Sequence, residues 1–238
     1  MKIGILQCDH VLEQFQPIFG DYPEMIVTLF AKVAPDCQFK AYQVQLLEYP
    51  QDLNECDAYI TTGSRHGVND DYDWINRLEV FICELDRAKK PLVGICFGHQ
   101  LMVKALGGIV KKSDKGWGIG VTHNQIVDSK SWMKPYQDRL NLIASHQDQV
   151  LCLPKSVKMD VLVSSPFCPH YMLTYGDHFI SFQGHPEFTK NYSAALMDFR
   201  RKLIPSERIQ EGEISLQADV DDQLMAQWIV NFITARMR

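Results

Sequence analysis

The amino-acid sequence predicts an α/β protein with a mainly parallel central sheet, flanking helices and a small antiparallel β insertion. Two observations indicate this fold. Over residues 1–106, short apolar runs alternate with longer segments whose apolar residues recur at helical spacing. Over residues 108–183, the runs are short and rich in β-branched residues, which is typical of antiparallel strands. The order of elements in the first half favours parallel strands joined by helices on both faces.

Each element is expected from a local pattern. Short apolar or alternating runs predict strands, and apolar residues every three or four positions predict helices. In the first half we expect strands at 2–7, 39–44, 57–61 and 91–95, and helices at 23–33, 74–89 and 97–106. In the insertion we expect strands at 120–127, 140–145, 159–164, 171–175 and 179–183, and helices close the chain at 191–203 and 221–236. The polar segment 205–220 has no strong periodicity, which predicts a flexible connection or a mobile flap.

Composition and charge exclude several classes of protein. With 46% hydrophobic and 22% charged residues, the 238-residue chain has the balance of a globular protein. The formal net charge is −5, from 24 Lys and Arg against 29 Asp and Glu, which argues against a nucleic-acid partner. The sequence contains neither a signal peptide nor an apolar run near the ~20 residues of a membrane span. Seven scattered cysteines without a C-x-x-C pair predict a reduced, cytoplasmic protein.

The most informative segment is Pro91-Leu-Val-Gly-Ile-Cys96-Phe-Gly-His-Gln100. An apolar strand leads into Gly94-Ile-Cys96-Phe-Gly98 and a helix follows, which is the arrangement of a nucleophile elbow with Cys in place of Ser. A helix N-terminus favours an anion and so lowers the pKa of a thiol. A buried structural cysteine is the simpler alternative, and we keep it for the other six cysteines. For Cys96, the flanking glycines favour a nucleophile.

A thiol nucleophile needs a base and a group that orients the base. The segment Gln183-Gly-His185-Pro-Glu187 follows the apolar run 179–182. Residues at i and i+2 of an extended segment point the same way, and Pro186 favours an extended His185. Glu187 can therefore hold the imidazole of His185, as the acid does in a catalytic triad. Without the elbow, this pair would be an incidental feature of a turn.

These motifs resemble the class I, triad-type glutamine amidotransferases over roughly residues 2–200. The elbow at Cys96 and the segment at His185 and Glu187 occur in the family's chain order. The segment Ser145-His146-Gln-Asp-Gln-Val150 resembles one in the glutaminase domain of GMP synthetase. The resemblance implies a flavodoxin-like catalytic domain over 1–204. Residues 205–238 would then be a helical extension packed on the same domain.

The resemblance also implies roles for individual residues. The backbone N–H groups of Gly63 and Phe97 would form the oxyanion hole. Gln100, with Ser145, His146 and Gln147, would hold the amino-acid end of the substrate. The loop Thr62-Gly63-Ser64-Arg65-His66-Gly67 departs from the family's common Gly-Gly-Pro and carries a cation. In this it is more similar to the stand-alone branch, which includes plant γ-glutamyl peptidases and bacterial proteins that resemble GMP synthetase glutaminases.

The expected reaction is hydrolysis of a γ-glutamyl amide, glutamine to glutamate plus ammonia, through a Cys-His-Glu triad and a thioester. No cofactor is expected, and no metal, because the histidines lack a familiar ligand spacing. Three alternatives remain open. The ammonia passes to a separate synthetase chain, or the protein acts alone on γ-glutamyl peptides or conjugates, or it is a non-catalytic binding or regulatory member of the fold.

Overall fold

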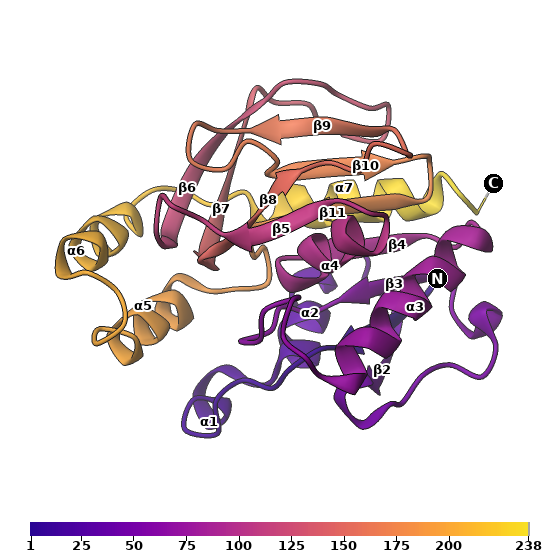
Figure 1. The fold of residues 1–238 in the computed structure, drawn as a ribbon, viewed down its shortest axis with the longest axis horizontal. Coiled ribbons are helices and arrows are strands. Elements are labelled where there is room, and N and C mark those ends of the chain that lie inside the picture. Colours follow the sequence, from indigo (N-terminus) through magenta and orange to yellow (C-terminus); the bar gives the residue numbers. More distant parts are fainter. Residues whose placement is uncertain (238) are drawn as a thin grey trace.

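A computed structural model describes residues 1–237. Its strands of the first half are β1 (Lys2–Gln7), β2 (Gln38–Gln43), β3 (Ala58–Thr61) and β4 (Leu92–Ile95). The later strands are β5 (Ile109–Lys112), β6 (Gly118–Ile126), β7 (Arg139–His146), β8 (Asp148–Cys152), β9 (Met159–Ser164), β10 (Met172–Tyr175) and β11 (Phe179–Phe182). Nine of them form one sheet in the order β2-β1-β3-β4-β11-β10-β9-β6-β7 (Figure 1).

The sheet is parallel at one end and antiparallel at the other. Strands β2, β1, β3, β4 and β11 pair in parallel, and β10, β9, β6 and β7 continue the same sheet with antiparallel pairing. The remaining two strands, β5 and β8, pair separately as an antiparallel ribbon. The predicted α/β fold class is confirmed. The antiparallel insertion mostly extends the central sheet, because its strands pair onward from β11.

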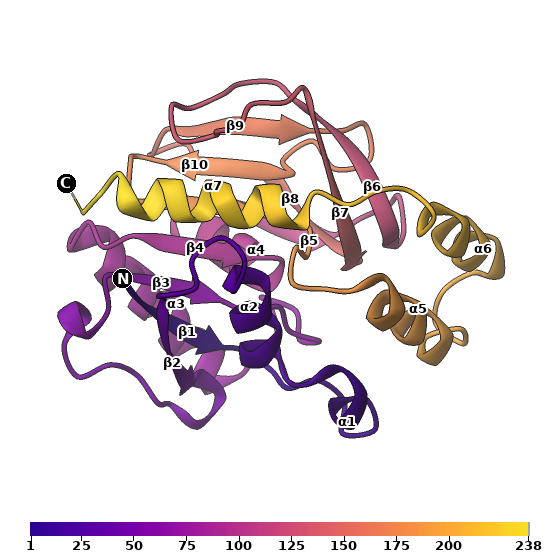
Figure 2. The same cartoon turned by 180° about the vertical axis from the view of Figure 1, so that it is seen from behind.

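Helices cover both faces of the sheet. On one face lie α3 (Asp73–Arg87) and α4 (Phe97–Ala105), which contact each other (Figure 1). On the other face lie α2 (Tyr22–Phe30) and α7 (Asp222–Thr234), also in mutual contact (Figure 2). Asp21 and Glu24 form a capping box that fixes the start of α2. Among the described residues, no helix is long and apolar enough to cross a membrane.

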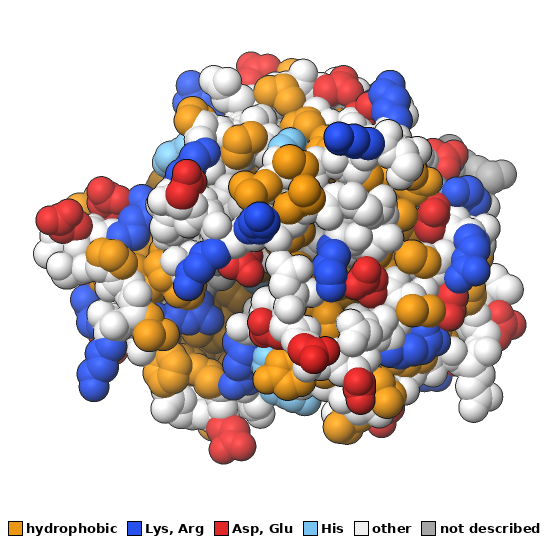
Figure 3. Space-filling view, in the orientation of Figure 1, with side chains coloured by type: hydrophobic (Ala, Val, Ile, Leu, Met, Phe, Trp, Pro, Cys, Tyr) orange, Lys and Arg blue, Asp and Glu red, His pale blue; other side chains and the backbone are white. Residues whose placement is uncertain are grey.

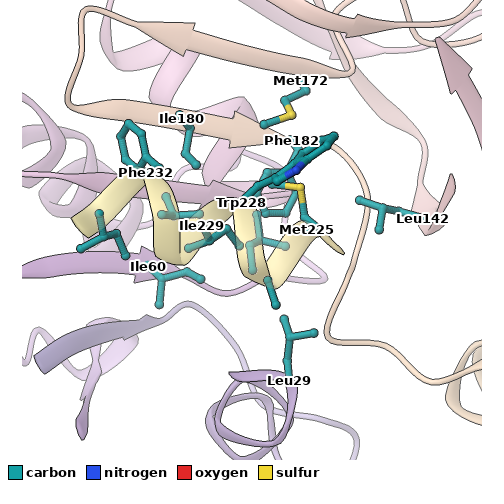
Figure 4. Packing of buried hydrophobic residues seen from close by; sticks show 14 of the residues in the cluster. Leu29, Ile60, Leu142, Met172, Ile180, Phe182, Met225, Trp228, Ile229 and Phe232 are labelled. Atoms are coloured by element: carbon teal, nitrogen blue, oxygen red, sulfur yellow. The ribbon is translucent and has the colours of Figure 1, made fainter. Parts of the chain in front are cut away.

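The last helix is part of the core. Trp228, Ile229 and Phe232 of α7 pack against Ile60, Ile180 and Phe182 of the sheet (Figure 4). The indole of Trp228 also donates a hydrogen bond to the carbonyl of Pro135 at 2.9 Å. Burying an aromatic side chain of this size stabilises a fold by a few kcal/mol, about 3–5 when the loss is measured by Ala substitution.

The chain around α7 differs from two predictions. The helix expected over 191–203 is α5 (Lys190–Phe199) and ends earlier, and the flexible connection predicted at 205–220 was wrong over α6 (Ser206–Ser215). In α6, only Ile209 and Gly212 are buried, so the segment carries no strong apolar period. Its stability comes from tertiary contacts: Gly212 lies against Ile119 of β6, and Ser215 Oγ accepts a hydrogen bond from the N–H of Val121 at 2.9 Å. Near the other end of the chain, the short helix α1 (Gln16–Phe19) was also not predicted from the sequence.

Candidate active site

The parallel strands bring the predicted site residues to one edge of the sheet. The carboxyl ends of β1, β3, β4 and β11 lie side by side, and Gly63, Cys96 and His185 follow three of these ends. Ligands of open α/β sheets bind at this edge. Long-range sheet pairing therefore brings together residues that are distant in the sequence.

Cys96 sits at the sharp turn between β4 and α4. Its backbone is left-handed, with φ 47° and ψ −93°, which a non-glycine residue rarely adopts. The N–H of Cys96 donates to the carbonyl of Phe182 at 2.9 Å, and Cys96 is the N-cap of α4. The thiol thus projects from a position that is fixed on both sides, as a nucleophile elbow requires.

The two glycines around Cys96 permit a close approach of strand and helix. A Cβ at Gly94 would lie 2.9 Å from the carbonyl carbon of Gly98. A Cβ at Gly98 would lie 1.7 Å from Oγ1 of Thr61, which accepts a hydrogen bond from the N–H of Ile95. A larger residue at position 94 would therefore move backbone of α4, and one at position 98 would displace the side chain of Thr61.

We expect Gly98→Ala to destabilise the fold by about 3 kcal/mol, because the added methyl would overlap the buried side chain of Thr61 and overpacking a core costs about 1–3 kcal/mol. For a chain of this size, that loss lowers Tm by roughly 6–12 °C, measured by circular dichroism. Gly116→Ala is the control: its added methyl meets nothing within 4 Å, and only the φ of 77° is strained. Equal melting temperatures for the two variants would contradict the steric explanation.

The imidazole of His185 lies in a buried, charged setting. Its Nδ1 is 2.7 Å from Oε1 of Glu187, and its ring stacks on Phe188 with centroids 3.9 Å apart. The N–H of His185 donates to the carbonyl of Ile143 at 2.7 Å, which ties the segment to β7. Burial lowers the pKa of His185, but the charges of Glu187 and Cys96 outweigh burial and raise this pKa to about 10. The imidazole therefore holds its proton at neutral pH.

The loop after β3 lies against this histidine. A Cβ at Gly63 would come within 2.8 Å of Cε1 of His185, so only glycine fits there. Within residues 1–237, the backbone N–H groups of Gly63 and Phe97 have no protein acceptor. The N–H of Phe97 is free because Phe97 is the first residue of α4. Two free N–H groups of this kind suit an anionic oxygen.

A pocket of about 320 Å³ opens over Cys96; we call it the inner hollow. Its walls include Phe97, Gln100 and the segment Ser145, His146 and Gln147, so all the predicted substrate-binding residues line it. Figure 3 shows this face of the molecule hollowed beside the α5–α6 lobe, with Lys and Arg side chains around the hollow. His146 is buried and its Nδ1 is 3.1 Å from the carbonyl of Asp148. Burial lowers the pKa of His146 to about 4, so this ring stays neutral.

Sequence reasoning missed Gln183, which adjoins the thiol. The fully buried Gln183 donates from Nε2 to Cys96 Sγ at 3.4 Å. The Oε1 of Gln183 accepts a hydrogen bond from the Nε2 of Gln100 at 3.1 Å. The Nε2 of Gln100 also donates to the carbonyl of Asp148 at 2.8 Å. These bonds fix the orientation of both amides. The position of Gln183 just before Gly184 and His185 was the available signal.

Sequence reasoning also missed Arg200, at the end of α5. Arg200 lines the inner hollow, donates from a terminal guanidinium nitrogen to Ser145 Oγ at 2.7 Å, and lies 5.6 Å from the ring centroid of Trp117. No acidic side chain within the described residues forms a salt bridge with it. The pattern of α5 gave no sign of this role, because the contact joins residues 55 positions apart.

Within the described residues 1–237, no group of His, Cys, Asp and Glu side chains is able to hold a metal ion.

Comparison with known proteins identifies the family to which this fold belongs. The sequence model of the family described as glutamine amidotransferase class-I matches residues 21–201. The chain therefore belongs to the class-I glutamine amidotransferase family. A solved glutamine amidotransferase from Thermotoga maritima superposes with a TM-score of 0.75 at 18% identity, covering 99% of this chain and 97% of that one, which supports the fold alone.

Within the family, two kinds of relative stand out. The chain is 30% identical over 230 residues to γ-glutamyl peptidase 3 of Arabidopsis thaliana, covering 92% of this chain and 90% of that protein. It is also 30% identical over 138 residues to a glutamine-hydrolysing GMP synthase subunit of Saccharolobus solfataricus, covering 58% of this chain and 70% of that protein. The predicted resemblance to both groups is confirmed.

Proposed function

We propose that this protein hydrolyses γ-glutamyl amides through a thioester on Cys96, with His185 and Glu187 completing a triad. The observation that carries the proposal is the arrangement at the carboxyl ends of the parallel strands. The thiol of Cys96 on a strand–helix turn, the buried pair of His185 and Glu187, and two backbone N–H groups without acceptors in the described residues all lie at this edge of the sheet. Relatives named γ-glutamyl peptidase and GMP synthase support cleavage at a γ-glutamyl carbonyl. We assign this chemistry to residues 1–204, with 205–238 as a helical extension packed on them, of which residue 238 lies outside the described residues.

In the first half of the reaction, the sulfur of Cys96 attacks the γ-carbonyl carbon. The oxyanion receives hydrogen bonds from the N–H groups of Gly63 and Phe97, and each such donor lowers a barrier by about 3 kcal/mol. His185 gives its proton to the departing nitrogen as the C–N bond breaks, and a thioester remains. Glu187 keeps the imidazole in place and stabilises its charge.

In the second half, water attacks the thioester carbonyl. His185, now neutral, takes a proton from this water, and the C–S bond breaks. Glutamate then leaves, His185 is protonated again, and the sulfur of Cys96 is free for the next turnover. Through both halves, Gln100 and the segment Ser145, His146 and Gln147 hold the amino-acid end of the substrate. Arg200, beside Ser145, is a cation that suits the substrate's α-carboxylate.

A direct test uses the purified protein with L-glutamine and with γ-glutamyl dipeptides. We expect glutamate release, and we expect added hydroxylamine to divert the thioester to γ-glutamyl hydroxamate, detected colorimetrically. We also expect 6-diazo-5-oxo-norleucine to label Cys96, located by mass spectrometry. The absence of glutamate, hydroxamate and label would favour the non-catalytic alternative.

The separate-synthetase alternative has one specific support, the match to a glutamine-hydrolysing GMP synthase chain. It predicts that glutamine hydrolysis rises when a candidate synthetase and its substrates are added. Hydrolysis that is equally fast with and without the synthetase would favour a hydrolase that acts alone.

A further inference from the structure

Beside the inner hollow lies a second one of about 750 Å³. We call it the outer hollow; it is lined by residues 9–14, Gln16, Gln45, Arg65, His66 and Phe199. We propose that the outer hollow binds the leaving group, and that this leaving group is an amino acid or peptide joined by its amino nitrogen to the γ-carboxyl of glutamate. This inference rests on the proposed function, because it concerns the amine that Cys96 displaces.

The two hollows meet along a shared boundary. Arg65 and His66 line both of them. On the facing side, the consecutive residues Phe199 and Arg200 line the outer and the inner hollow respectively. The ring of Phe199 also contacts Phe15 of the loop before α1, with centroids 6.1 Å apart. A substrate bound over Cys96 can therefore continue past Arg65 into the outer hollow.

The direction of the leaving group follows from the position of the proton donor. His185 lies against Gly63, where a Cβ would come within 2.8 Å of Cε1. Gly63 begins the stretch that leads through Ser64 to Arg65 and His66. The glutamyl end is assigned to Gln100 and the segment at Ser145, so the nitrogen that accepts the proton of His185 is on the side of this loop. What is attached to that nitrogen points toward the outer hollow.

Hydrogen bonds hold the wall of the outer hollow in place at Asp9, Val11 and Arg65. The carboxylate of Asp9, only 4% exposed as a residue, accepts from the Nε of Arg65 at 2.8 Å and from a terminal nitrogen at 2.9 Å. The backbone N–H of Arg65 donates to the same carboxylate at 2.8 Å. Asp21 accepts from the N–H of Val11 at 2.8 Å and lies 2.6 Å from Nδ1 of His10. Two buried or half-buried carboxylates thus preorganise this wall, which lowers the entropic cost of binding.

The lining matches the chemistry of a peptide. Gln14 and Gln45 offer amide groups that can both donate to and accept from a peptide bond. Phe199, 53% exposed, offers an apolar ring for a side chain. Arg65 lines both hollows, and its cation suits the terminal carboxylate of a peptide. Ammonia, the leaving group of glutamine, would use none of these groups.

The test compares kcat/KM for L-glutamine, γ-glutamyl-leucine and γ-glutamyl-leucyl-glycine, measured by glutamate release. For the wild type we expect both peptides to exceed glutamine at least tenfold. Gln14→Trp, which fills the outer hollow from an exposed position, should lower the ratio of peptide to glutamine at least tenfold, and Phe199→Ala should lower it less. Ile18→Trp is the matched control, because Ile18 is 73% exposed on α1 and outside the hollow, so its ratio should match the wild type.

Two results would overturn the inference: a wild type that hydrolyses glutamine as fast as the peptides, or a Gln14→Trp variant whose ratio is unchanged. Hydrolysis of glutamine alone would leave the proposed function standing and remove only the leaving-group subsite. Failure to release glutamate from any of the three compounds would remove both. Phe199→Ala keeps the test valid if Gln14→Trp does not fold.

Discussion

Cys96→Ala is expected to abolish hydrolysis of γ-glutamyl amides, with a fall in kcat of roughly 10⁴- to 10⁶-fold, as for removal of other catalytic nucleophiles. Alanine cannot form the thioester, so the hydroxamate trap should also give no product. The fold should persist, because alanine takes the same backbone conformation and only a sulfur atom is lost from the pocket. Glutamate release and thermal unfolding measured on the same preparation check both expectations.

The matched control is Cys152→Ala, which removes an exposed thiol outside the inner hollow. It should keep wild-type activity. Cys168, in the same core cluster as Cys96, is a second comparison, since burial raises the pKa of its thiol to about 12 and leaves it unreactive. Activity that survives Cys96→Ala but is lost in another cysteine variant would place the nucleophile elsewhere.

Glu187→Gln should lower kcat about 10³- to 10⁴-fold, similar to loss of the carboxylate in a serine protease triad. The amide keeps the size of the side chain but removes the charge that raises the pKa of His185. Burial then opposes only the effect of Cys96, so this pKa falls and the imidazole holds less firmly the proton that the leaving amine needs. The amide also donates where the carboxylate accepts, which favours the wrong tautomer. Rates measured from pH 5 to 10 report the change.

The same pair has a signature in stability. Because the pKa of His185 is about 10 in the folded protein and ~6.5 in an unfolded chain, its contribution to the free energy of unfolding is fully present below pH ~6.5. It is lost as the pH rises through about 10. In Glu187→Gln this part of the pH dependence should be smaller, as measured by urea unfolding at pH 7 and pH 10, because only Cys96 then still raises the pKa of His185. Glu187→Asp, which keeps the charge, should lose less of it; an identical dependence in all three proteins would contradict the role of Glu187.

Local patterns predicted the elements whose stability is local or strongly periodic. The parallel half could be predicted because α3 buries Ile75, Leu78 and Ile82 on one face and β4 is a short apolar run between turn residues. The strand–turn–helix at Cys96 and the pair at His185 could be found because their spacing in the sequence carries the geometry. These same features positioned the predicted site at the carboxyl ends of the parallel strands.

What could not be predicted depends on contacts between distant residues. Helix α6 has a weak apolar period and is held by β6, so its own sequence resembled a loop. Strands β5 and β8 pair with each other and not with the central sheet, and the local sequence of neither strand indicates which partner it takes. Arg200 and Gln183 reach the inner hollow only through tertiary structure, so their part in the site was visible only once the sheet was assembled.

Under the proposed mechanism, the left-handed backbone of Cys96 sets activity and stability in opposition at one residue. A non-glycine residue in such a region costs about 1–3 kcal/mol, which the rest of the fold must supply. Glycine at position 96 would be free of this strain, yet it would have no sulfur to offer. Selection for stability alone would therefore favour glycine at this turn. Cysteine at position 96 lowers the free energy of unfolding, which is small in any native protein.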